Sequence, residues 1–190
     1  MNRSSKILFT VGLMLTATTA AAHPGHAEGG FASGLMHPLL GLDHLLAMAA
    51  IGLWSIRQGN VMKYGTPLFV IGGMFLGAGV AWAGLSVPGV ETGIALSVLL
   101  AGVLLATLVR LPTAVGGTLV VAFMMCHGYA HAAEMPAGAH IAAYMAGFAL
   151  ATLGITLAGR GLGALLMKTD SRITRGIGAI LAATGAVLAS

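Results

Sequence analysis

At 190 residues, with 57% hydrophobic and only 7% charged side chains, the chain has the composition of an integral membrane protein. Soluble domains carry about 25% charged residues, and a globule this poor in charge could not cover its surface in water. The net charge of +4 comes from scattered residues without interleaved aromatics, which excludes a nucleic-acid-binding surface. A single cysteine, Cys126, excludes an intrachain disulfide and a CxxC metal motif.

The N-terminus has the pattern of a cleaved signal peptide. Two basic residues precede the apolar stretch Ile7–Leu15, and small residues then lead to Ala20-Ala21-Ala22. This pattern predicts a signal peptide over 1–22 and a mature chain, 23–190, that begins outside the cytoplasm. The alternative is an uncleaved first transmembrane helix, which is disfavoured because the apolar stretch is much shorter than the ~20 residues of a span.

The mature chain is expected to be one transmembrane domain, an all-α integral membrane protein built as a bundle of six transmembrane helices. All apolar segments except the last approach the ~20 residues that cross a bilayer. In the second, Gly73-x-x-x-Gly77 predicts close contact with another helix. The expected spans are Leu35–Ile56, Tyr64–Gly84, Gly89–Val109, Pro112–Ala132, Gly138–Gly159 and Ile173–Ala189.

The basic residues predict the orientation of the bundle. Every Lys and Arg after residue 22 lies in or beside the first, third or fifth loop between the expected spans. The second and fourth loops contain no basic residue. Cytoplasmic loops carry the excess of Lys and Arg, so both termini of the mature chain are expected outside. If the membrane is a bacterial inner membrane, as the family resemblance described below implies, both the N- and C-termini are periplasmic. The residues are Arg57, Lys63, Arg110, Arg160, Lys168, Arg172 and Arg175.

The first expected span contains an H-x5-D-H motif formed by His37, Asp43 and His44. An ionisable side chain inside a span costs about 3 kcal/mol or more, so each is a candidate functional residue. The two histidines share one helix face but lie ~10 Å apart along a straight helix. We expect Pro38 to occupy the first helical position, which leaves His37 in the preceding turn and free to approach the other two.

A second motif lies at the end of the fourth expected span. His127, His131 and Glu134 are spaced four and three residues apart, so they project from one helix face. Two imidazoles with a nearby carboxylate form a plausible chelate for a divalent transition metal. The proposed topology puts both motifs and Glu91 in the outer half of the membrane, as a cation entry site, whereas His140 is expected to be an interfacial residue.

The two motifs resemble a known family. The run from His37 to Gly52 resembles the first signature of the HupE/UreJ family of nickel/cobalt permeases, and the run from His127 to Glu134 resembles the second. The resemblance covers the whole chain and implies a secondary permease that imports Ni²⁺ and/or Co²⁺, with no prosthetic group, often for hydrogenase or urease. It implies metal contacts from His37, Asp43, His44, His131 and Glu134, with Glu91 and His127 added.

Some properties stay open at the level of sequence. Cys126 and Ala132 depart from the family pattern beside the second motif, which puts the metal preference in doubt. Imidazole and carboxylate ligands suit Ni²⁺, Co²⁺ and Zn²⁺ alike. A zinc-dependent intramembrane hydrolase is the alternative function, and a metal-sensing or metal-storing protein is a third. A sequestering role for His23 and His26, and the oligomeric state, are also open.

Overall fold

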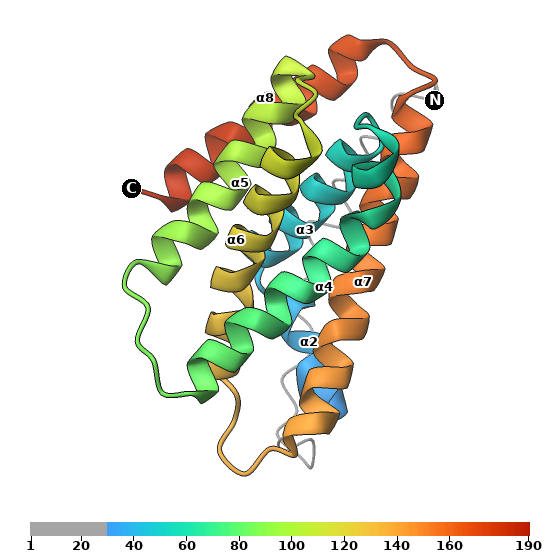
Figure 1. The fold of residues 1–190 in the computed structure, drawn as a ribbon. Coiled ribbons are helices and arrows are strands. Elements are labelled where there is room, and N and C mark those ends of the chain that lie inside the picture. The colour runs from blue at the N-terminus through green and yellow to red at the C-terminus, as the bar shows by residue number, and fades with distance from the viewer. Residues whose placement is uncertain (1–29) are drawn as a thin grey trace, which may run out of the picture.

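The computed structural model describes residues 30–190, and every regular element in that range is a helix (Figure 1). The predicted signal peptide and both His23 and His26 lie outside the described residues. The helices are α2 (Phe31–Leu40), α3 (Leu42–Ser55), α4 (Asn60–Trp82), α5 (Val90–Thr107), α6 (Thr113–Ala133), α7 (Ile141–Leu166) and α8 (Ser171–Leu188).

The helices account for part of the predicted set of six spans. Each of the four helices α4 to α7 is long and apolar enough to cross a membrane, and α2 with α3 makes a fifth span if the bent pair is counted together. Helix α8, the sixth expected span, is not in this group, because polar residues fill four of its first five positions. A multi-pass membrane protein is supported, but six spans are not confirmed.

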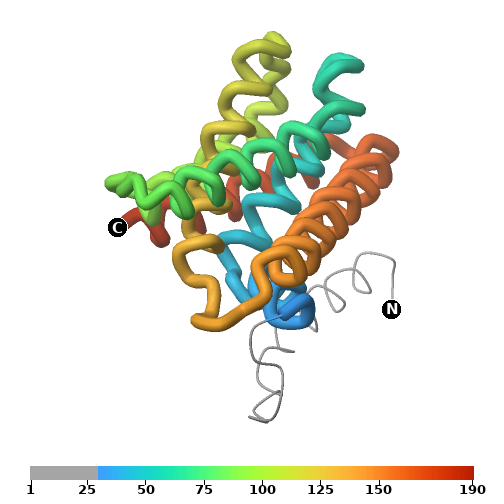
Figure 2. Tube along the Cα trace, turned by 60° about the horizontal axis from the view of Figure 1, so that its bottom comes forward, coloured from blue at the N-terminus to red at the C-terminus, as the bar shows by residue number. Residues whose placement is uncertain are grey.

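The first expected span is broken rather than continuous. Helix α2 ends at Leu40, Gly41 is extended (φ −76°, ψ 107°), and α3 leaves at 79° to α2 (Figure 2). The prediction that Pro38 occupies the first helical position was wrong, because Pro38 lies inside α2. The break falls at Gly41 instead, since glycine is a poor helix former and Asp43 in the first turn of α3 stabilises a new helix N-terminus.

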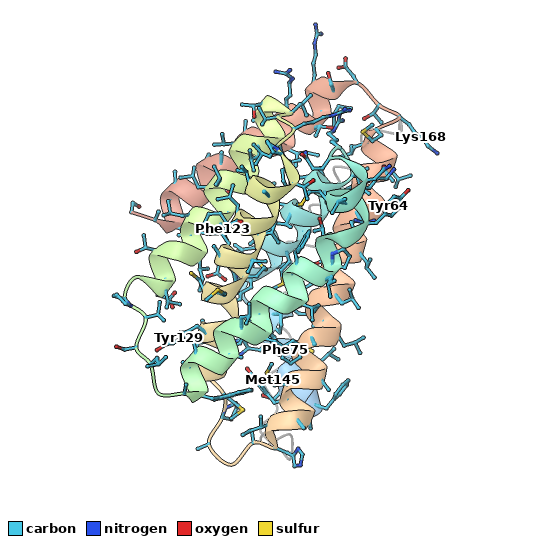
Figure 3. All side chains as sticks on the ribbon, viewed as in Figure 1. Tyr64, Phe75, Phe123, Tyr129, Met145 and Lys168 are labelled. Atoms are coloured by element: carbon cyan, nitrogen blue, oxygen red, sulfur yellow. The ribbon has the colours of Figure 1, made fainter. Side chains whose placement is uncertain are left out.

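Antiparallel neighbours give the bundle two distinct ends. The loops after α3, α5 and α7 lie together at one end, near Tyr64 and Lys168, and the loops after α4 and α6 lie at the other, near Tyr129 and Met145 (Figures 1 and 3). We call the first the basic end, because the loops there carry the predicted cytoplasmic Lys and Arg residues. At the opposite end, α5 begins and α6 finishes.

Glycines bring the helix that carries the second motif into backbone contact with α4. A methyl group on Gly77 would clash with the carbonyl oxygen of Met125, and one on Gly128 with that of Met74. Gly73 approaches the same helix, so the predicted role of Gly73-x-x-x-Gly77 in close packing is confirmed. Equivalent contacts join α3 to α7, and α3, which carries the end of the first motif, lies at the centre of the bundle between α4, α5 and α7.

Candidate metal centre

The bend between α2 and α3 gathers four imidazoles from three helices. His37 and His44 have ring centroids 6.5 Å apart, closer than a straight helix would place them. The ring of His131 lies 4.6 Å from that of His37 and 4.5 Å from that of His44. His127, one turn earlier in α6, lies 4.5 Å from His44. These four side chains form what we call the imidazole cluster.

The imidazole cluster is largely buried, and within residues 30–190 four of its eight ring nitrogens are buried without a hydrogen-bond partner. His127 and His131 are fully buried, His44 is 7% exposed, and only His37 is half-buried. Nε2 of His44, Nδ1 of His127 and both ring nitrogens of His131 have no hydrogen-bond partner among residues 30–190. An unpaired buried polar atom costs about 1–3 kcal/mol, and such atoms are rare in folded proteins unless they serve a function. The cluster therefore contains four buried ring nitrogens that are available to a ligand.

Two carboxylates determine which nitrogens carry protons at the mouth of the cluster. Nδ1 of His44 lies 2.7 Å from Oδ1 of Asp43, and Nε2 of His37 lies 3.0 Å from Oε2 of Glu134. A carboxylate only accepts, so each imidazole donates through that nitrogen and keeps a lone pair on the other. This carboxylate–histidine pairing is the usual support of a metal-ligating histidine, because it holds the ring and raises its basicity.

An open pocket of about 280 Å³ leads to the imidazole cluster and joins the two motifs. It is lined by five of the predicted site residues together with Leu40 and Gly41. The remaining two, His127 and His131, contact His44 beneath it. The structure therefore brings all seven predicted residues to one place, although that they bind metal stays a prediction. The five lining residues are His37, Asp43, His44, Glu91 and Glu134.

In this conformation the side chains are close to one another but do not form a chelate. Among residues 30–190, no group of three or more His, Cys, Asp or Glu side chains is arranged so that it could hold a metal ion. Neighbouring rings meet edge to face, with interplanar angles between 67° and 89°. The cluster is thus a set of available nitrogen ligands whose lone pairs do not converge on one point.

Three contacts of the imidazole cluster were missed at the sequence level. The ring of Phe148 packs 4.4 Å from that of His131, and the hydroxyl of Tyr144 donates to the carbonyl oxygen of His131. Ser97 of α5 lies 2.9 Å from Nε2 of His127. No sequence signal could have identified Ser97, because a serine within a span commonly bonds only to its own helix.

Two other residues near the motifs, His140 and Cys126, lie outside the cluster. His140 is exposed and stands at the N-cap of α7, where its Nδ1 accepts a bond from the backbone N–H of Ala143. Cys126 is half-buried and packs against Val90 and Ile94. Neither residue lines the pocket, which agrees with the interfacial position expected for His140.

Comparison with known proteins identifies the family. The family described as HupE / UreJ protein matches residues 11–188. The chain belongs to the HupE/UreJ family. This HupE/UreJ family member is similar to Protein HupE of Rhizobium leguminosarum bv. viciae. The two sequences are 39% identical over 188 residues, which cover 97% of each chain. No solved structure matches the chain.

Proposed function

We propose that this HupE/UreJ family member is a secondary permease that imports Ni²⁺ and/or Co²⁺ across the bacterial inner membrane for enzymes such as hydrogenase or urease. The observation that carries the proposal is the set of four buried imidazole nitrogens that have no hydrogen-bond partner within residues 30–190, in a cluster where carboxylates support two of the histidines. Membership of the family favours a permease over a zinc-dependent intramembrane hydrolase. The metal ion is the transported substrate in this proposal.

The spacing of the imidazole cluster suits a first-row transition metal. An imidazole nitrogen ligates such an ion at about 2.0–2.1 Å, which puts two rings on adjacent ligand positions roughly 4.5–5 Å apart between centroids. The three closest pairs in the cluster lie at 4.5 to 4.6 Å. The ring separations are therefore compatible with a shared ion, although the rings must reorient before their lone pairs meet.

The positions of the acidic and basic residues support entry of the metal ion from the end of the bundle opposite the basic end. Glu91 and Glu134 are exposed beside the pocket, where they would attract a divalent cation and replace part of its water shell. With the basic end in the cytoplasm, the ion moves down the membrane potential. Two charges gain about 4.6 kcal/mol per 100 mV, so accumulation does not require ATP.

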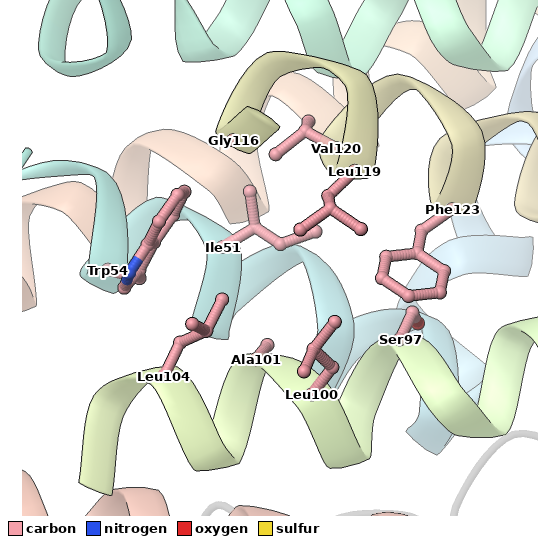
Figure 4. Close-up of a pocket in the computed structure, with 10 residues that line it drawn as sticks. All are labelled: Ile51, Trp54, Ser97, Leu100, Ala101, Leu104, Gly116, Leu119, Val120 and Phe123. Atoms are coloured by element: carbon pink, nitrogen blue, oxygen red, sulfur yellow. The ribbon is translucent and has the colours of Figure 1, made fainter. Parts of the chain in front are cut away.

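Beyond the imidazole cluster, on the side of the basic end, the structure leaves little free space between α3, α5 and α6. A cavity of about 20 Å³ lies between α3, α5 and α6, with Ser97 at one end and Trp54 at the other (Figure 4). It has room for about one water molecule, and its walls are apolar, as Ile51 and Leu104 illustrate. If the ion leaves by this route, its release into the cytoplasm would require these three helices to separate here.

Uptake of ⁶³Ni²⁺ by proteoliposomes tests the proposed function. We expect uptake that is faster and more concentrative with an inside-negative potential, with accumulation on the order of 10³-fold at 100 mV. Excess Co²⁺ should inhibit ⁶³Ni²⁺ uptake. The same measurement with excess Zn²⁺ ranks the three metals by how strongly each competes. Protein-free liposomes are the control. Folded, reconstituted protein that transports none of the three ions would contradict the proposal.

Reporter fusions test the proposed orientation. Fusions after Arg57, Arg110 and Lys168 should report the cytoplasm, because the basic end of the bundle carries the Lys and Arg residues. Fusions after Val87 and Ser190 should report the periplasm. A cytoplasmic C-terminus would overturn the six-span topology, since it requires an odd number of spans after an outer N-terminus.

A further inference from the structure

Within residues 30–190, a single hydrogen bond joins the imidazole cluster to α5, and Ser97 makes it. The side chain is 1% exposed, and its Oγ lies 2.6 Å from the carbonyl oxygen of Ile94 and 2.9 Å from Nε2 of His127. His127 is fully buried, and its other nitrogen, Nδ1, has no partner in the same range. Ser97 is therefore placed where it can decide the tautomer of this imidazole.

The two distances assign the protons. A carbonyl oxygen cannot donate, so two oxygens only 2.6 Å apart require that the hydroxyl of Ser97 donates to Ile94. The hydroxyl oxygen is then the acceptor for His127, whose Nε2 must carry the ring proton. It follows that Nδ1 of His127 has the free lone pair.

His127 also has the deepest position in the cluster. His37 and His44 line the open pocket, whereas His127 contacts His44 from beneath. Its partner Ser97 lines the small cavity between α3, α5 and α6 (Figure 4). An ion that moves from the pocket toward the basic end thus meets His127 last.

The partners of the imidazoles differ in charge along this path. His37 and His44 donate to carboxylates, which raise the basicity of a ligating imidazole. His127 donates to a neutral hydroxyl, so it is the weaker ligand of the three. Strong ligands at the entrance and a weaker one at the inner end favour capture from outside and onward release.

We propose that Ser97 is a positioning residue that holds His127 in the Nε2–H tautomer and so makes its Nδ1 the last, weakly binding ligand before the ion leaves toward the cytoplasm. This inference rests on the proposed function, because it assigns the exit step of the same site. It concerns the rate of transfer rather than capture, since the outer histidines and carboxylates do not depend on Ser97.

Kinetics of ⁶³Ni²⁺ uptake with Ser97→Ala test the exit role. We expect the maximal rate to fall about 10-fold or more, the scale of losing a hydrogen-bond partner behind a ligand, with little change in the half-saturating concentration. Ser97→Thr keeps the hydroxyl and should restore most of the rate. Thr156→Val is the matched control, because it removes a buried hydroxyl that bonds only to its own helix at Thr152. Equal losses in the Ala and Thr variants would overturn the proposal.

Nitrogen NMR of ¹⁵N-histidine-labelled protein without metal gives a second readout, independent of transport. The wild type and Thr156→Val should show the Nε2–H form at His127, and Ser97→Ala should show a mixture of tautomers. An unchanged His127 signal in Ser97→Ala would overturn the inference. Wild-type protein that shows the expected tautomer but transports no Ni²⁺, Co²⁺ or Zn²⁺ would instead refute the proposed function, so the two failures are distinguishable.

Discussion

Replacement of His131 by leucine is expected to abolish ⁶³Ni²⁺ uptake without loss of folded protein. His131 contacts both His37 and His44, so it is the centre of the imidazole cluster. Leucine has about the volume of histidine but no ring nitrogen, which removes a ligand without opening a cavity. Both nitrogens of His131 are buried and have no partner in the part of the chain that the structure describes, so their removal relieves a cost of about 1–3 kcal/mol per atom. The melting temperature in detergent should therefore equal or exceed that of the wild type.

The His131→Leu experiment is decisive because uptake is expected to fall while the melting temperature stays the same or rises. A histidine that only packs or bonds between helices would lower stability when replaced and leave uptake largely intact, since such bonds average only ~0.6 kcal/mol in membranes. His140→Ala is the control, because His140 is exposed and outside the cluster. Wild-type uptake by His131→Leu at equal expression would show that the α6 histidines are not part of the metal site.

Asp43→Ala is expected to weaken the apparent affinity for Ni²⁺ by about 10–100-fold, the usual cost of losing a hydrogen-bond partner behind a metal-ligating histidine. Oδ1 of Asp43 accepts from Nδ1 of His44 and from its backbone N–H, both at 2.7 Å, and so orients the ring with Nε2 toward the cluster. Asp43→Asn keeps an oxygen acceptor but loses the charge, so an intermediate affinity is expected. The measurement is the half-saturating Ni²⁺ concentration for uptake.

A second aspartate gives the matched control for Asp43. Asp170 precedes α8, and its Oδ1 also accepts a backbone bond, from Arg172 at 2.9 Å, but it has no imidazole partner. Asp170→Ala should cost about 1 kcal/mol of stability as a lost helix cap and leave the affinity for Ni²⁺ unchanged. Equal affinities in Asp43→Asn and Asp43→Ala would show that Asp43 acts through its charge rather than by orienting His44.

Much of the architecture could be predicted from the sequence because it depends on local properties. The membrane class follows from composition, and helices α4 to α7 follow from apolar runs bounded by Pro, Gly and basic residues. The two clusters of ionisable residues were recognisable because charge inside an apolar run is costly. Gly73-x-x-x-Gly77 predicted a close helix contact because only small residues permit one.

The assembly of the site was decided by contacts between distant segments, which local patterns do not encode. The α2–α3 break falls at Gly41 rather than before Pro38, and the resulting 79° bend lets His37 reach Glu134, 97 residues away. Ser97 approaches His127 only because α5 and α6 pack side by side. Sequence by itself therefore determined which ionisable residues lie in the apolar segments as candidates for a site, whereas the tertiary structure decided which of their nitrogens are free, because proton positions depend on hydrogen-bond partners supplied by the fold.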